Sequence, residues 1–144
     1  MNMSQEWKYQ LRIRMSEKVA RLARQTPDDP VLKPLAEVLE KHGARLQNQF
    51  DAFAAYVAQA EQNNATDEAL YKWTKATIEN PLKEAKYLTA FTLYVDGEEV
   101  YEKAKADRLE AEMQPLVGGE LVKSMSRHDT NPANNPQPPK RYRS

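Results

Sequence analysis

Two short stretches of this sequence place basic side chains beside groups that can recognise another molecule. Between residues 8 and 15 polar and apolar side chains alternate, and the polar set is Lys8, Gln10, Arg12 and Arg14. Near the other end of the sequence, a second set consists of Lys140, Arg141, Tyr142 and Arg143. Arginine and glutamine can hydrogen-bond to base edges, lysine can pair with phosphates, and a tyrosine ring can stack on an exposed base. These two sets are the candidate contacts for nucleic acid or for a protein partner.

The residue types that catalysis or metal binding needs are scarce. There is no cysteine, which excludes thiolate nucleophiles, disulfides, iron–sulfur clusters and zinc ribbons. No GxSxG turn supports either histidine, His42 or His128, and the acidic pairs at 28–29 and 98–99 are sequence neighbours whose side chains diverge. With no Walker motif and four glycines in all, a cofactor cradle is not expected. We expect no enzyme, catalytic residue, cofactor or metal site, unless carboxylates from distant segments converge.

Charge is unevenly distributed, although the formal net charge is zero. Residues 1–25 contain six basic and two acidic side chains, and residues 123–144 contain five basic and one acidic side chain. Each end therefore carries a net charge of +4, and the segment between them carries −8. This pattern indicates a polyanionic partner, or basic ends that fold back on the acidic body or face a partner protein.

Hydrophobic periodicity predicts the elements that position these residues. Residues 8–15 form a half-buried strand, with Tyr9, Leu11, Ile13 and Met15 on its apolar face. Ser16 caps a helix that runs to about residue 25. Further helices are expected at about 34–42, 44–62, 66–79 and 103–113, with a short helical turn at 120–125 and an ambiguous segment at 82–89.

Asp96-Gly97 predicts a β-hairpin over residues 91–101, because a type I′ turn needs positive φ at both central residues. Val95 then pairs with Glu98, and Leu93 pairs with Val100. In this register Tyr94 and Tyr101 lie on the face opposite to Leu93. The aromatic residues that can line a partner surface, or pack under a helix, are Trp7, Tyr9, Tyr94 and Tyr101.

These elements predict an α+β fold. We expect a mostly helical single globular domain over residues 1–126, with about five helices and a small antiparallel sheet made of the N-terminal strand and the 91–101 hairpin. The strand joins the hairpin within the chain or across a homodimer. Residues 127–144 contain four prolines and no aliphatic residue larger than alanine, which predicts a disordered basic tail. Without a long apolar run, we expect no membrane span and no secretory signal, and hence a cytoplasmic protein.

The stretch KYQLRIRMSEKVARLARQ, residues 8–25, resembles the opening of the ribbon-helix-helix DNA-binding family, in which a basic strand precedes a Ser-capped helix. The resemblance implies that two strands from a dimer enter the major groove and present Lys8, Gln10, Arg12 and Arg14 to base edges. A basic amphipathic strand is also typical of an ordinary sheet edge, where charge prevents aggregation.

Two functions remain open at this point. The first is a non-enzymatic protein-interaction module, that is, a small adaptor, inhibitor or complex subunit with an unidentified protein partner. The alternative is a nucleic-acid-binding regulator or accessory factor that uses the basic strand and the basic tail.

Overall fold

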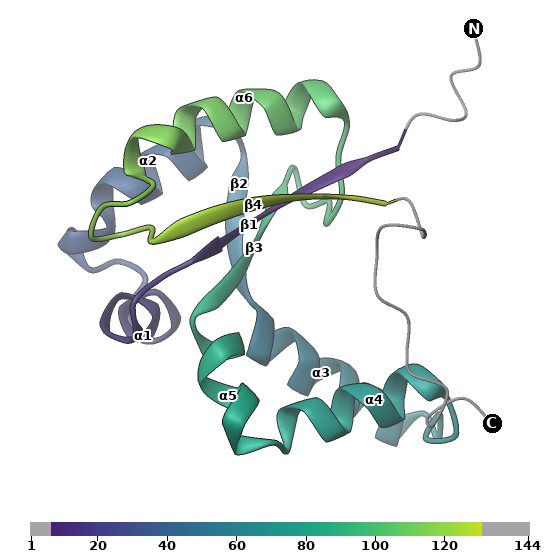
Figure 1. Ribbon diagram of the computed structural model, residues 1–144. Coiled ribbons are helices and arrows are strands. Elements are labelled where there is room, and N and C mark those ends of the chain that lie inside the picture. Colours follow the sequence, from purple (N-terminus) through teal and green to yellow (C-terminus); the bar gives the residue numbers. More distant parts are fainter. Residues whose placement is uncertain (1–6, 131–144) are drawn as a thin grey trace, which may run out of the picture.

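The computed structural model describes residues 7–130 and forms a four-stranded antiparallel sheet with six helices (Figure 1). The strands are β1 (Tyr9–Arg14), β2 (Ala44–Asn48), β3 (Ala90–Val95) and β4 (Ser124–Asp129). The helices are α1 (Glu17–Gln25), α2 (Lys33–Lys41), α3 (Gln49–Gln62), α4 (Ala69–Ile78), α5 (Pro81–Leu88) and α6 (Lys103–Met113). The predicted α+β class is confirmed, with one helix more than expected.

The strands lie in the order β2-β3-β1-β4, and each neighbouring pair is antiparallel. Consequently β1 runs parallel to β2 with β3 between them, and β3 runs parallel to β4 with β1 between them. Helices connect each of these parallel pairs, which is the split β-α-β, or ferredoxin-like, connectivity. Along the chain, helices α3, α4 and α5 are inserted between β2 and β3. These two strands are neighbours in the sheet, and a short hairpin loop could connect them.

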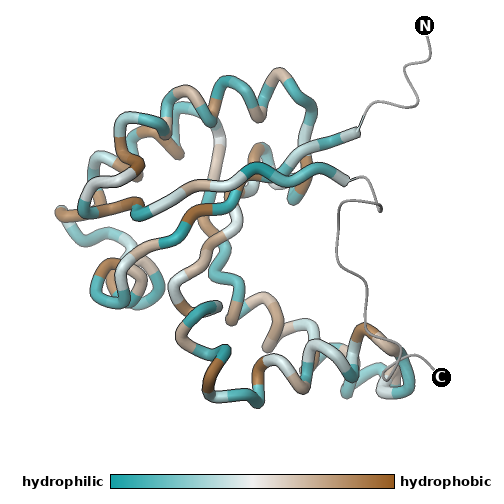
Figure 2. Tube along the Cα trace, viewed as in Figure 1, coloured by the Kyte–Doolittle hydropathy of each residue, from teal (hydrophilic) through white to brown (hydrophobic). Residues whose placement is uncertain are grey.

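The sheet has an apolar face and a polar face, because side chains alternate along each strand. On the apolar face Leu11 lies opposite Leu93, and Ile13 lies opposite Phe91. Helices α2 and α6 contact the sheet on this side, and brown apolar segments recur along the central strands in Figure 2. The main core combines this face with residues of α1, α2 and α6, so the basic residues of β1 point away from it.

Residues 44–48 were expected in a helix, but they form β2. Gly43 ends α2 with φ +61°, a left-handed conformation that redirects the chain. Leu46 then pairs with Leu93, and the helix begins only after Asn48, whose side chain accepts a hydrogen bond from the Asp51 amide. The apolar residues between 46 and 58 have the spacing of a helix. Pairing with β3 nevertheless makes a strand of residues 44–48, the first five positions of the expected helix.

The Asp96-Gly97 turn is confirmed, whereas the second strand of the predicted hairpin is absent. Asp96 and Gly97 have φ +53° and +80°, and two backbone hydrogen bonds join Val95 to Glu98. The chain then leaves β3, and Tyr101 pairs with Tyr9 of β1 in an isolated bridge. Tyr101 is 1% exposed and lies in the main core, so its predicted position on the opposite face is wrong.

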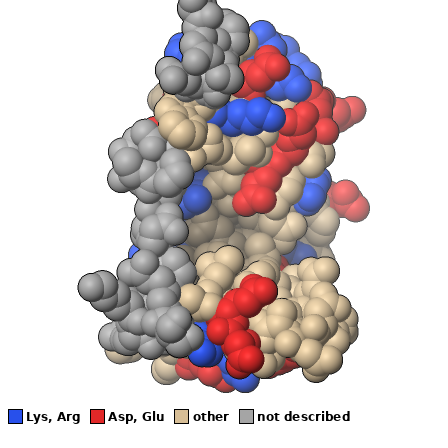
Figure 3. Space-filling view, turned by 90° about the vertical axis from the view of Figure 1, so that its right-hand side faces the viewer, with Lys and Arg blue, Asp and Glu red and all other residues tan. Residues whose placement is uncertain are grey.

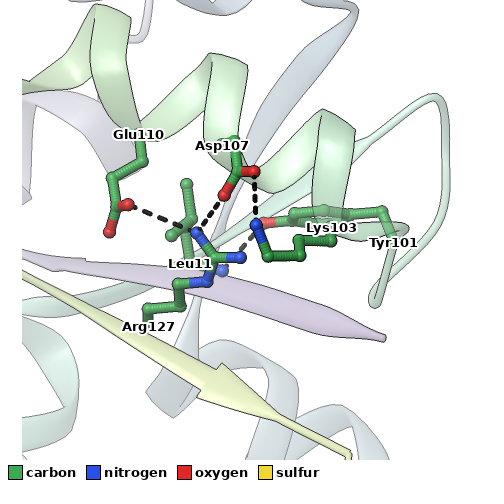
Figure 4. A network of polar contacts seen from close by, with 6 residues as sticks. All are labelled: Leu11, Tyr101, Lys103, Asp107, Glu110 and Arg127. Carbon is green, nitrogen blue, oxygen red and sulfur yellow. Dashed lines mark hydrogen bonds and ion pairs between the residues drawn. The ribbon is translucent and has the colours of Figure 1, made fainter. Parts of the chain in front are cut away.

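Residues 124–129 were expected as a helical turn and the start of the tail, but they form β4 along β1. Arg127 lies on the apolar side, opposite Leu11, where a charged group needs partners. Helix α6 supplies them, because the Arg127 guanidinium lies 2.7 Å from Asp107 Oδ1 and 3.3 Å from Glu110 Oε1 (Figure 4). The predicted tail boundary at residue 127 therefore falls inside a strand.

Strand β1 pairs with β3 on one side and with β4 on the other. Neither edge of β1 is free to pair with a second copy of the chain. In this arrangement β1 is a central strand of the sheet, unlike the two-stranded ribbon that the ribbon-helix-helix resemblance implies. Within the described chain, all four strands of the sheet come from the same copy.

Helices α3, α4 and α5 form an arm below the sheet in Figure 1. The arm has its own small apolar cluster, which is separate from the main core and consists of Val57, Ala60 and Tyr71. Asn80 caps α5, and Pro81 occupies its first turn, which explains why the ambiguous segment at 82–89 is helical. These three helices project from one end of the sheet, and they lie on the side of its polar face.

Candidate nucleic-acid interface

The polar face of the sheet, called here the open face, brings together side chains from all four strands. Its central row crosses the sheet in register from Gln47 through Thr92 and Arg12 to Ser126. The remaining polar members of the open face are Gln10, Arg14, Arg45, Tyr94, Ser124 and His128. Figure 3 shows the molecule hollowed between the sheet above and the helical arm below, with basic and acidic side chains both bordering the hollow.

Among the residues expected to face a partner from β1, Gln10 has a different role. Its side chain is only 5% exposed, because the segment after the Asp96-Gly97 turn covers it. The Gln10 amide nitrogen donates to the Glu99 carbonyl at 3.0 Å, and its oxygen accepts from Arg12 Nε at 2.6 Å. Gln10 is therefore largely covered and positions Arg12.

Lys8 is exposed just before β1, where its backbone amide donates to the Thr130 hydroxyl. Arg12 and Arg14 lie half-buried on the open face, as the alternation predicted. The remaining predicted contacts, Lys140, Arg141, Tyr142 and Arg143, lie outside the described residues.

Arg12 and Arg14 are held in place by neutral groups. Arg14 donates to the Lys86 carbonyl at 3.0 Å and to the Thr89 hydroxyl at 3.3 Å, at the C-terminal end of α5. Burial lowers the pKa of Arg12 below its ordinary value, an effect that the charges of Glu99 and Tyr87 partly offset. Among residues 7–130, no carboxylate lies within 4 Å of either guanidinium. Both positive charges are thus fixed on the open face without a direct ion pair to any residue of that range.

Sequence reasoning missed the pair formed by Arg45 and Tyr94. The Arg45 guanidinium lies 4.4 Å from the centre of the Tyr94 ring, a cation–π geometry that presents a flat, positively charged platform. Burial and the charge of Glu99 raise the pKa of Tyr94, while Arg45 lowers it. Arg45 was assigned to a helix, and only the strand pairing of β2 brings it across from Tyr94.

A cleft of about 330 Å³ lies at the end of the open face from which the arm projects. Strand β1 forms its floor with Arg12 and Arg14, and α5 forms one wall with Lys86 and Tyr87. The remaining lining residues are Ile13, Gln49, Ala90, Ser124, Ser126 and His128. We call this site the cleft. It places hydroxyl donors beside three permanent cations.

His128 is the titratable member of the cleft. Its Nε2 atom lies 2.9 Å from the Ser126 hydroxyl oxygen, so the two side chains of β4 are hydrogen-bonded. Burial and the neighbouring charge of Arg12 lower the pKa of His128, while Asp129 acts in the opposite direction. The pattern Ser124, Ser126, His128 alternates with period two, and this was the available signal for a polar strand face.

Other kinds of site are not evident within residues 7–130. No three His, Cys, Asp or Glu side chains there are grouped so that they could hold a metal ion. The helices in that range are each too short or too polar to cross a membrane. In comparisons with known proteins, no family model, no curated protein and no solved structure matched this chain.

Proposed function

We propose that this protein binds single-stranded nucleic acid on the open face of its sheet. The observation that carries the proposal is the open face itself, on which strand pairing brings together three arginines, the half-buried Tyr94 ring under Arg45, and several hydroxyl and amide groups. Arginines that lack carboxylate partners attract phosphates, and a ring stacked under a guanidinium offers a surface to an unstacked base. Bases in a duplex are already stacked, so a single strand suits this surface better.

The charge pattern supports the same proposal. The negative charge of the body is placed partly in ion pairs, such as Asp107 and Glu110 with Arg127 beneath α6. Lys41 pairs with Glu112, between α2 and α6 on the other side of the sheet, and Lys75 pairs with Glu61 within the arm. A formal net charge of zero therefore does not prevent the open face from being locally basic.

The test is fluorescence anisotropy with a labelled mixed-sequence single strand, as DNA and as RNA, and with the duplex of the same sequence. Affinity should fall with salt at a slope of about −2 in log–log form, because three neutralised phosphates each release counterions. Arg12→Ala and Arg45→Ala should each weaken binding about fivefold to tenfold, the cost of one charge-assisted contact of about 1 to 1.5 kcal/mol. The duplex should bind more weakly than the single strand.

Arg108→Ala is the matched control, because it removes the same charge from α6, on the other side of the sheet. It should leave affinity unchanged, and thermal melting should confirm that all variants are folded. Failure of the wild-type protein to bind any strand at low salt would rule out the proposal. Equal weakening by Arg12→Ala and Arg108→Ala would show that the effect is one of net charge alone.

A protein-interaction module remains the second candidate, and a specific groove favours it. Beside β2, an apolar groove of about 490 Å³ is lined by residues of α1, α2 and β2, including Leu35, Ala36 and Leu46. Within the part of the chain that the structure describes, β2 pairs only with β3, so its outer edge can accept another strand. The occupant that fits both features is an extended, alternately apolar segment of a partner protein.

A peptide library displayed on phage and selected on the full chain tests this second candidate. Enriched peptides should alternate apolar and polar residues and should lose binding to Ala36→Glu, which places a charge in the groove. Peptides with no such alternation, or with undiminished binding to this variant, would exclude the groove as the docking site.

A further inference from the structure

The cleft differs in charge from three other clefts in the described part of the molecule. Each of those contains at least one carboxylate among its lining residues, namely Glu17 and Glu84 in one, Asp96 in a second and Glu40 in a third. The cleft on the open face is lined by Arg12, Arg14, Lys86 and His128 and by no Asp or Glu. Its electrostatic potential therefore selects for an anion.

Within residues 7–130 the direct contacts of the three cations are to neutral groups, and the charge of Glu99 acts on Arg12 without an ion pair. Arg12 donates to the Gln10 amide oxygen, and Arg14 donates to a backbone carbonyl and a hydroxyl. The Lys86 ammonium lies 5.4 Å from the centre of the Tyr87 ring. Each side chain is oriented by such a contact and forms no ion pair with the residues that the structure describes, an arrangement preorganised for an anion.

Three fixed cations exceed what one internal phosphodiester can balance, since that group carries a single negative charge. A terminal phosphate monoester carries about −1.5 to −2 at pH 7 and offers three acceptor oxygens. Arginine donors and the hydroxyls of Ser124 and Ser126 match such a group in number and kind. The chemistry of the lining thus fits a strand end better than the middle of a strand.

The walls of the cleft lead to the same conclusion. Residues of α5 and Gln49, the first residue of α3, border it at the end of the sheet where the arm begins. A volume of about 330 Å³ is near the lower limit for ligand pockets and accepts one small group rather than a continuous chain. The cleft therefore has room for a single phosphate group at this end of the open face.

We propose that the cleft is the subsite for the terminal phosphate of a nucleic-acid strand whose remaining nucleotides lie on the open face. This inference rests on the proposed function, because it assigns the end of the strand that the open face binds. Arg12, Arg14 and Lys86 supply the charge, and Ser124 and Ser126 supply neutral hydrogen-bond donors. The Arg45–Tyr94 platform, on β2 and β3, takes a base further along the strand.

The experiment compares three versions of one labelled oligonucleotide, which carry a 5′-phosphate, a 3′-phosphate or hydroxyl groups at both ends. Anisotropy titrations at fixed pH and salt give the ratio of affinities for phosphate-ended and hydroxyl-ended strands. One of the two phosphorylated versions should bind about tenfold more tightly than the hydroxyl-ended strand, and this arm identifies which end the cleft takes. Lys86→Ala should reduce this ratio by at least about threefold.

Two further variants separate the cleft from the rest of the open face. Arg45→Ala should weaken binding of all three oligonucleotides and preserve the ratio, and Arg108→Ala should change neither quantity. Equal affinities of the wild-type protein for the three versions would overturn the inference while leaving the proposed function in place. A ratio that Lys86→Ala leaves intact would overturn it as well, whereas binding of no strand at all would overturn both proposals.

Discussion

At the scale of single residues, a tyrosine from outside the sheet satisfies backbone groups inside it. The Tyr101 hydroxyl accepts a hydrogen bond from the Leu11 amide at 2.8 Å and donates one to the Leu93 carbonyl at 2.9 Å. All three residues are at most 1% exposed, so water cannot replace the hydroxyl. This single contact joins the two central strands to the segment that follows the Asp96-Gly97 turn, and it explains why Tyr101 is buried although the chain around it is irregular.

Tyr101→Phe should therefore destabilise the protein by at least about 2 kcal/mol, because a buried donor and a buried acceptor each lose their partner at a cost of about 1–3 kcal/mol. Urea unfolding followed by circular dichroism measures the change. Tyr94→Phe is the matched control, since this side chain is partly exposed on the open face and should cost less than about 0.5 kcal/mol. Similar losses in the two variants would show that the Tyr101 hydroxyl has no special role.

The ion pairs beneath α6 predict a dependence of stability on acid. Hydrogen bonds from Arg127 and then from Lys103 lower the pKa of Asp107 (Figure 4). A carboxylate with a lowered pKa in the folded state contributes stability above its ordinary value near 4, and this contribution is lost as the pH falls through the folded value. Asp107→Asn should therefore lose less stability than the wild-type protein between about pH 5 and pH 2.

Urea titrations at a series of pH values test this prediction. Asp28→Asn is the control, because Asp28 is an exposed carboxylate that makes no ion pair within residues 7–130. It should follow the acid profile of the wild-type protein. Parallel profiles for the wild-type protein and Asp107→Asn would contradict the assignment.

At the scale of elements, two residues with a left-handed backbone conformation, Gly43 and Asp96, determine where β2 begins and where β3 ends. Gly43 separates α2 from β2 with φ +61°, and its carbonyl accepts a hydrogen bond from the Asp96 amide at 2.8 Å. A Cβ atom at Gly43 would lie 2.5 Å from Asp96 Oδ1, and Asp96 is itself held by Lys105 at 3.0 Å. The end of α2 and the end of β3 therefore depend on each other through this contact.

Gly43→Ala should cost about 2–3 kcal/mol, because left-handed strain of about 1–2 kcal/mol adds to displacement of the Asp96 side chain. Gly97→Ala is the matched comparison, because it has φ +80° but open space around the added methyl group. It should cost only the strain, about 1–2 kcal/mol. Thermal unfolding of both variants gives the difference, and a Gly43→Ala protein as stable as Gly97→Ala would contradict the steric argument.

Elements with strong local signals could be predicted from the sequence. The structure has a helix at 103–113, a Ser16-capped helix that ends at residue 25 and a turn at Asp96-Gly97, as expected. Strands β2 and β4 were not predicted: the apolar spacing after residue 44 favoured a helix, and the alternation of Ser124, Ser126 and His128 is a weak signal without an alternating apolar set. The position of β4 also depends on α6, because the carboxylates of α6 pair with Arg127 on the apolar side of the sheet.

The same distinction applies to the candidate site. Alternation in β1 was sufficient to place Arg12 and Arg14 on a shared polar face, and the structure does so. It did not reveal that a later segment covers Gln10, nor that Arg45 and His128 join the open face. Those residues reach it through the strand order β2-β3-β1-β4, which depends on contacts between segments far apart in the sequence.

At the scale of the whole molecule, the sheet layer and the helical arm have separate apolar clusters. Polar contacts carry much of the connection between them. Arg24 of α1 holds Asp51 of α3 with two hydrogen bonds, and the Asn48 amide donates to the Leu88 carbonyl at the end of α5. Edge-to-face packing of Phe53 and Tyr87 adds an apolar contact at the base of the arm.

Because the apolar cluster of the arm is small, the arm should open more readily than the sheet. Amide hydrogen exchange should therefore show faster exchange in α4 than in β1 and β3. A single strand bound on the open face with its end in the cleft contacts Lys86 and Tyr87, so it should slow exchange in α5 and leave α2 unchanged. Arg12→Ala, measured at the same strand concentration, should show less protection of α5. Slowed exchange in α2 without any change in α5 would instead place the ligand on the side of the sheet opposite the open face. That result would contradict the open face as the binding surface.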